Sequence, residues 1–171
     1  MSTTIPEITD LRGSALFWHV MDILKGLPPV APGACGTGWD QDQWRRIRQS
    51  DDRCGTAMCL AGWMCHVTGG RWLVTYDTSG KRFLNGKPCD KPLEAYEEYL
   101  LVEHFDEKGG QHVIKMDGHD DVRVISAADR ALTLLGVDSV DTDSGWLFSG
   151  GNDYEDLEWI GRILFGARPA A

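Results

Sequence analysis

The thiols and imidazoles are the side chains of this sequence best suited to chemistry. Cys54 and Cys59 lie at the predicted start of a helix, and a helix N-terminus lowers the pKa of a cysteine and so favours the reactive thiolate. A thiol nucleophile also needs a base, and His112, at the start of a predicted strand, is the best-placed histidine, ahead of His104 and His119. The pattern therefore indicates Cys54 or Cys59 with His112 as a candidate catalytic pair.

The local sequence weakens that hypothesis. Residues 54–59 lack the Cys-Gly-Ser-Cys-Trp signature of papain-like hydrolases, and reduced cysteines more often serve as small buried apolar residues. No phosphate-binding glycine loop, Gly-x-Ser-x-Gly turn or His-Glu-x-x-His motif is present. A cysteine-dependent hydrolase therefore stays an alternative, and a binding protein is the preferred interpretation.

The spacing does not favour a metal site. Cys59 and His66 share a helix face, but their backbones would lie about 10 Å apart along the axis, too far for zinc bonds of about 2.0–2.3 Å. Asp138, Asp141 and Asp143 form an acidic loop without the glycine and glutamate positions of a calcium-binding EF-hand. We therefore expect no metal and no cofactor.

The aromatic and acidic side chains indicate a binding surface instead. Trp39, Trp72 and Trp146 fall in predicted loops or at the start of a predicted hairpin, where an aromatic ring can anchor a partner. Trp18, Trp63 and Trp159 fall on apolar helix faces, which places them in the core. The predicted binding residues are Trp39, Trp72, Trp146, Asp138, Asp141 and Asp143.

Charge is distributed unevenly along the chain. Residues 1–89 hold 10 Lys and Arg against 8 Asp and Glu, whereas residues 90–171 hold 7 against 18. An acidic surface of this kind repels nucleic-acid phosphates and favours a protein partner with a basic surface. No window approaches the roughly 20 apolar residues of a membrane helix, so we expect no membrane contact. The N-terminal residues lack a secretion signal, so we expect a cytoplasmic protein whose 5 cysteines stay reduced.

Hydrophobic periodicity and cap residues predict the elements that must position these side chains. The chain is organised around a buried central helix at about residues 57–67, with Thr56 as its N-cap. Alternation predicts a hairpin over residues 71–84 and a strand over residues 111–116, which together give a small antiparallel sheet. Leu147 and Phe148 are expected to fold back on the core. The other predicted helices cover residues 9–25, 39–48, 92–105, 126–136 and 153–165.

Several of these segments resemble a group of small uncharacterised proteins encoded by actinobacterial phages and their hosts. The resemblance covers about half of the chain, and its central motif is Cys-Gly-Thr-x-x-Cys-Leu-Ala-Gly-Trp, at residues 54–63. The resemblance is carried by Trp39, Trp44, residues 54–56, residues 59–63, residues 131–136, and Leu147 with Phe148. It implies a phage genome in an actinobacterial host and assigns no catalytic residue.

Together these observations predict a single α+β domain over residues 1–171. Residues 1–8 and 167–171 are expected to be flexible, and residues 71–121 to be an insertion. For function we expect a phage-type accessory protein that binds a host or phage macromolecule in the bacterial cytoplasm without catalysis. The alternatives are the hydrolase that uses Cys54 or Cys59 with His112, and an acidic nucleic-acid mimic. The oligomeric state stays open.

Overall fold

The computed structural model describes residues 10–27, 38–41, 45–50, 53–77, 79–108, 110–115, 121–138 and 144–169. Within these ranges, only the backbone is described for residues 46–50, 53–57, 107–108 and 144–145. The α-helices are α1 (Gly13–Gly26), α2 (Leu60–Val67), α3 (Ala127–Leu135), α4 (Ser144–Leu147) and α5 (Tyr154–Phe165), and η1 (Glu94–Tyr96) and η2 (His104–Lys108) are 3₁₀ turns. The strands are β1 (Gly38–Trp39), β2 (Arg46–Ser50), β3 (Arg53–Met58), β4 (Val74–Tyr76), β5 (Arg82–Leu84), β6 (Lys87–Pro88), β7 (Tyr99–Leu101), β8 (Gln111–Ile114) and β9 (Val122–Ser126).

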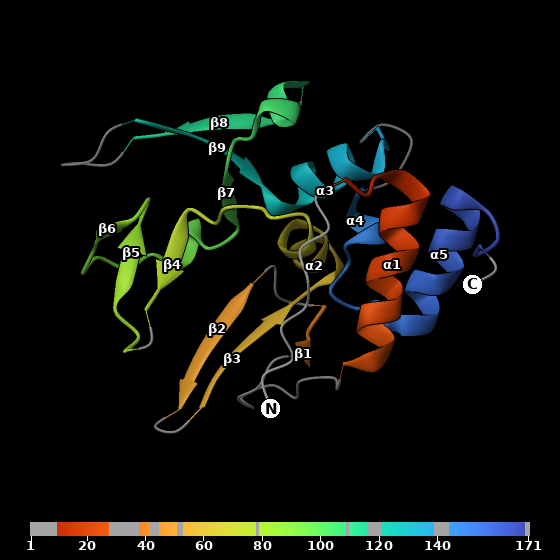
Figure 1. Cartoon of the computed structure of the whole chain (residues 1–171), viewed down its shortest axis with the longest axis horizontal. Helices are drawn as coiled ribbons and strands as arrows, with labels where there is room; N and C mark the ends of the chain where they lie inside the picture. The colour runs from red at the N-terminus through yellow and green to blue at the C-terminus, as the bar shows by residue number, and fades with distance from the viewer. Residues whose placement is uncertain are drawn as a thin grey trace.

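The strands form three-stranded sheets in the orders β1-β3-β2, β4-β5-β6 and β7-β9-β8. In the first sheet β1 runs parallel to β3, and the other pairs are antiparallel. Figure 1 shows α1, α4 and α5 on one side of the molecule and the sheets spread over the other, with α2 between them. The chain therefore has the α+β class that the sequence predicts.

Helix α2 begins later than the sequence predicts. Residues 53–58 form β3, so Thr56 lies in a strand and is not the N-cap. Cys59 takes that position, and its Sγ accepts a hydrogen bond from the backbone N–H of Gly62 at 3.5 Å. The segment is extended because β2 pairs with residues 53–57 and β1 with residues 57–58, which gives its backbone groups partners without a helical turn. Every residue of α2 except His66 is buried.

Two predicted helices are wrong in the described part of the chain. Residues 46–50 form β2, antiparallel to β3. Residues 99–101 form β7, between two 3₁₀ turns, where the sequence predicts one helix over residues 92–105. Leu100 fits a helical stripe, but it is buried in β7 opposite Ile125 of β9. Pairing with a distant strand thus overrides the local periodicity.

The predicted hairpin is present, but the predicted third strand belongs to another sheet. β4 and β5 pair antiparallel, and β6 adds a third strand to them. β8 pairs instead with β9, a strand that the sequence does not predict. The single sheet expected from residues 71–84 and 111–116 is therefore two sheets. They are linked where the N–H of Leu73 donates to the carbonyl of Tyr99 at 2.9 Å.

Helices α3 and α5 begin where the sequence predicts, and the first residue of each predicted range is the N-cap. Ser126 Oγ accepts from the N–H of Asp129 at 3.1 Å, and Gly136 ends α3 in the left-handed region at φ 66°. Asp153 caps α5 and forms a capping box with Asp156. In both cases a short polar side chain satisfies an N–H that the first turn leaves unpaired, so the start is encoded locally.

Helix α1 begins at Gly13, not at residue 9 or 10, and its N-cap residue Arg12 makes no capping side-chain hydrogen bond. Its exposed side contacts the C-terminal segment: Arg168 forms an ion pair with Asp22, and its guanidinium lies 5.6 Å from the centroid of the Trp18 ring. Arg168, one of the C-terminal residues 167–171 that are expected to be flexible, thus contacts α1. Residues 1–8 lie outside the described residues.

The described core contains two buried clusters. The larger joins α1, α2, α3 and α5 with Leu147 and Phe148, which fold back as the sequence predicts. The smaller lies between the hairpin and β9 and contains Leu73, Val74, Leu84, Cys89, Leu93 and Val124. A buried ion pair ties α3 to η2: Arg130 Nη1 lies 2.8 Å from Asp106 Oδ2, and both side chains are enclosed.

Candidate functional site

Cys59, one of the two cysteines of the predicted thiol site, is a buried, protonated thiol. Cys59 lies at the N-terminus of α2, the position that activates a thiol in some enzymes, but its side chain is only 1% exposed. Burial raises the pKa of Cys59 to about 12, which outweighs the backbone N–H groups that favour the thiolate. The thiol is therefore protonated at neutral pH, and a nucleophilic cysteine requires the opposite shift.

The other two residues of the predicted pair do not join Cys59. Cys54 lies in β3 opposite Gln49, and its side chain is outside the described part of the structure. His112 is an exposed residue of β8 whose ring lies edge-on to Tyr99, with 6.1 Å between the centroids. β8 and β3 lie on opposite sides of α2 (Figure 1). The described residues thus assemble no thiol–imidazole pair from these candidates.

Trp39 and Trp72, two predicted binding residues, make contacts within their own chain. Trp39 Nε1 donates to Gln41 Oε1 at 3.2 Å. Trp72 is buried, and the guanidinium of Arg45 lies 4.8 Å from its ring centroid while Arg45 Nη1 donates to the carbonyl of Val74 at 2.7 Å. Burial lowers the pKa of Arg45 to about 10, against the opposing effect of Glu97, so it stays charged at neutral pH.

The predicted acidic binding residues are only partly described. Asp138 is exposed after the end of α3, whereas Asp141 and Asp143 lie outside the described residues. Within the described ranges, no three His, Cys, Asp or Glu side chains are grouped so that they could hold a metal ion.

Trp146, the third predicted aromatic, forms an exposed site with two residues of α5. Its ring is 38% exposed and stands at 85° to the ring of Trp159, with 5.1 Å between the centroids. Trp159 is 55% exposed, and Ile163, one turn further along α5, is 54% exposed. We call these three residues the aromatic patch. They account for most of the large exposed apolar side chains among the described residues, the others being Phe105 and Val113.

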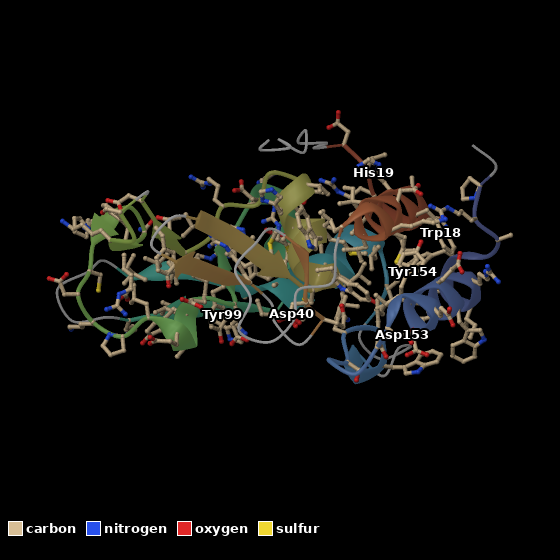
Figure 2. The ribbon with its side chains drawn as sticks, turned by 90° about the horizontal axis from the view of Figure 1, so that it is seen from below. Trp18, His19, Asp40, Tyr99, Asp153 and Tyr154 are labelled. Carbon is tan, nitrogen blue, oxygen red and sulfur yellow. The ribbon has the colours of Figure 1, made fainter. Side chains whose placement is uncertain are left out.

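Helix α5 presents the patch because its opposite face is in the core. Leu157 and Ile160 are buried, and Gly161 lets the Phe17 ring of α1 approach so closely that a Cβ there would lie 2.1 Å from Phe17 Cε1. With that face against α1, Trp159 points away from the core. Figure 2 labels Asp153 and Tyr154 at the beginning of this helix.

Hydrogen bonds hold the α4 side of the patch in place. Asn152 Nδ2 donates to the carbonyls of Trp146 and Leu147 at 2.6 and 3.2 Å, which ties the end of α4 to the start of α5. Gln41 Nε2 also donates to the carbonyl of Leu147 at 3.5 Å, and Gln41 Oε1 accepts from the N–H of Leu60 at 3.0 Å. Because the Leu147 side chain is fully buried, the backbone beside Trp146 is anchored to the core.

Trp18, Trp63 and Trp159 are predicted from the sequence to lie in the core. Trp18 and Trp63 are buried, but Trp159 is exposed, so that prediction is wrong for Trp159. A signal was available: Trp159 and Ile163 are four residues apart and lie off the stripe of Leu157 and Ile160. Two large apolar residues on the polar side of an amphipathic helix indicate a surface site.

No protein-family model, curated protein or solved structure matches the chain. Among the helices that the structure describes, none is long and apolar enough to span a membrane.

Proposed function

We propose that this chain is a non-catalytic accessory protein that binds another protein through the aromatic patch of Trp146, Trp159 and Ile163. The observation that carries the proposal is the contact between the exposed indole rings of Trp146 and Trp159. The sequence predicts Trp159 in the core, yet its ring lies on the surface. Large apolar side chains gathered on a surface mark interaction sites, and tryptophan is enriched among the residues that dominate binding energy.

The patch is prepared for binding before a partner arrives. Trp159 and Ile163 project from a helix whose other face is packed against α1, and the backbone of Trp146 is held by Asn152. Little conformational entropy is lost when such residues are buried in an interface. Preorganisation of this kind favours a specific contact over a nonspecific sticky surface.

Charge around the patch favours a basic partner. The first part of α5 carries four carboxylates within six residues, Asp153, Glu155, Asp156 and Glu158. Residues 90–171, which include the patch, carry 18 Asp and Glu against 7 Lys and Arg. We infer a partner protein with an apolar groove bordered by lysine and arginine, since complementary charge speeds association and selects the partner.

The non-catalytic part of the proposal rests on the cysteines. Cys59 and Cys65 are both buried, and burial raises the pKa of both thiols, to about 12 for Cys59. Such thiols fill space and do not attack a substrate at neutral pH. The setting that we propose, a phage protein or its bacterial counterpart in the host cytoplasm with a host or phage protein as partner, rests on the resemblance of the Cys-Gly-Thr-x-x-Cys-Leu-Ala-Gly-Trp motif alone.

A quantitative binding experiment tests this proposal. Tagged wild-type protein is used to recover partners from an actinobacterial lysate, and the affinity of each recovered protein is then measured for a Trp159→Ser/Ile163→Ser variant. We expect the variant to bind at least about 30-fold more weakly, because loss of a binding hot spot costs about 2 kcal/mol or more.

Val113→Ser is the matched control, because Val113 of β8 is 55% exposed and apolar but lies outside the patch. It should bind like the wild type. Equal affinity of the patch variant and the wild type would contradict the proposal, and so would failure to recover any partner reproducibly.

A further inference from the structure

The two indoles of the aromatic patch form a corner. Their ring planes stand at 85°, with 5.1 Å between the centroids, so the edge of one ring is directed at the other in a T-shaped pair. Both rings are partly open to solvent. The face of an indole carries negative electrostatic potential, and tryptophan is the aromatic residue that attracts cations most strongly. In a T-shaped pair, the face of one ring stands at a right angle to the part of the other ring's face that it leaves uncovered, and both surfaces can border one cationic group.

A carboxylate lies next to this corner. Glu155 is exposed and lies one helical turn before Trp159, on the same side of α5 as Trp159 and Ile163. The other acidic residues of this part of the helix are engaged: Asp153 and Asp156 form the capping box, and Glu158 Oε2 lies 3.2 Å from Arg162 Nη2. Among the described residues Glu155 has no ion-pair partner, so its charge is available to a ligand.

Three other aromatic rings among the described residues lie beneath arginine side chains. Guanidinium groups lie over Trp72, Trp18 and Phe105 at 4.8, 5.6 and 4.7 Å from the ring centroids, and Phe105 has two, those of Arg12 and Arg130. Within the described residues, no guanidinium lies over Trp146 or Trp159. Unlike Trp72, Trp18 and Phe105, the two indole rings of the patch therefore have no cation from the described part of their own chain.

We propose that the corner formed by Trp146 and Trp159 receives a lysine or arginine side chain of the partner protein, with Glu155 as its counter-charge and Ile163 against a neighbouring apolar side chain. This assignment rests on the proposed binding function and specifies its ligand. It also requires a protein partner, because the same carboxylates repel the phosphates of a nucleic acid.

Two small probes test the assignment without a known partner. Acetyl-leucyl-arginine amide supplies a cation and an apolar side chain, and acetyl-leucyl-citrulline amide is its neutral counterpart of nearly the same shape. Each is titrated into the full-length protein while the indole Nε1–H resonances are followed by NMR. We expect the arginine probe to shift the Trp146 and Trp159 resonances and to bind about three- to thirtyfold more tightly than the citrulline probe.

Variants and internal controls make the result specific. Glu155→Gln should reduce the preference for arginine over citrulline, Trp159→Leu should abolish it, and added salt should weaken it. The resonances of Trp63 and Trp72 should not move, because these rings are buried. Equal binding of the two probes, shifts confined to other indoles, or no shift at the highest soluble concentration would overturn the assignment.

The outcome is separable from that of the partner experiment. If Trp159→Ser/Ile163→Ser loses its partner while the arginine and citrulline probes bind equally, the patch is a docking surface and the cation assignment is wrong. If the arginine probe binds preferentially while that variant keeps wild-type affinity for every recovered partner, the proposed function is wrong although the corner recognises cations.

Discussion

Removing one member of the buried ion pair between Arg130 and Asp106 is expected to destabilise the protein by about 3–5 kcal/mol. Asp106 Oδ2 accepts from Arg130 Nη1 at 2.8 Å and from the N–H of Glu103 at 2.9 Å, and neither charged side chain reaches solvent. Either single substitution leaves a charge in an enclosed site. An exposed pair contributes about 1 kcal/mol or less, so burial decides which magnitude applies.

The pair itself is expected to contribute much less than that cost. In the described part of the chain, Asp106 Oδ1 and Arg130 Nε have no hydrogen-bond partner. Burial raises the pKa of Asp106, although Arg130 and the N–H of Glu103 act in the opposite direction, so the site disfavours the carboxylate relative to water. Replacing both partners with apolar residues, Asp106→Leu with Arg130→Met, should therefore recover most of the lost stability.

Urea unfolding followed by tryptophan fluorescence measures these free energies for the wild type, each single variant and the double variant. Arg71→Met is the matched control, because Arg71 Nε lies 3.0 Å from Glu103 Oε1 on an exposed surface, and it should cost about 1 kcal/mol or less. A loss below about 1 kcal/mol for Arg130→Met would refute the reasoning from burial. A double variant no more stable than the weaker single variant would refute the claim that the unpaired charge dominates.

Other predictions concern acid, packing, capping and thiol reactivity. Because the pKa of Asp106 is raised in the folded state, the folded protein holds a proton on this carboxyl at pH values where the unfolded chain has lost it. The contribution of Asp106 to stability should therefore fall as pH rises from the unfolded pKa of about 3.9 through the folded value. An Asp106→Asn variant whose stability has the same pH dependence as the wild type would argue against this. Gly161→Ala should lower the unfolding free energy, since repacking around Phe17 costs about 1–3 kcal/mol and the gain in helix propensity is about 1 kcal/mol; wild-type stability would show that the ring moves aside easily. Ser126→Ala should cost about 1 kcal/mol through loss of the α3 cap, measured by the same urea titration, and no change would mean that the cap is dispensable. Alkylation of Cys59 near neutral pH should be slow in the folded protein and fast in denaturant; rapid labelling of folded protein would instead support the hydrolase hypothesis.

The candidate site was partly visible in the sequence. Trp146 is predicted there as a binding residue because it falls in a loop, where an aromatic ring can anchor a partner. Trp159 is not, because any large apolar residue near a helical stripe resembles core. Only the packing of α5 against α1 shows which face of the helix is covered, and with it that Trp159 lies beside Trp146 on the surface.

The sequence by itself determined the elements whose signals are local. The caps at Ser126 and Asp153 act within one helical turn, and the hairpin of β4 and β5 closes over a few residues, so their positions follow from neighbouring residues. Only the tertiary structure decided the strand state of residues 99–101, because β7 is extended through hydrogen bonds to β9, a strand elsewhere in the chain. Residues 53–58 pair with the adjacent strand β2 and, at residues 57–58, with β1, so only part of their pairing is distant in sequence. The tertiary structure also decided the state of the thiol, since the pKa of Cys59 depends on how completely the surrounding elements exclude water and not on its place at a helix N-terminus.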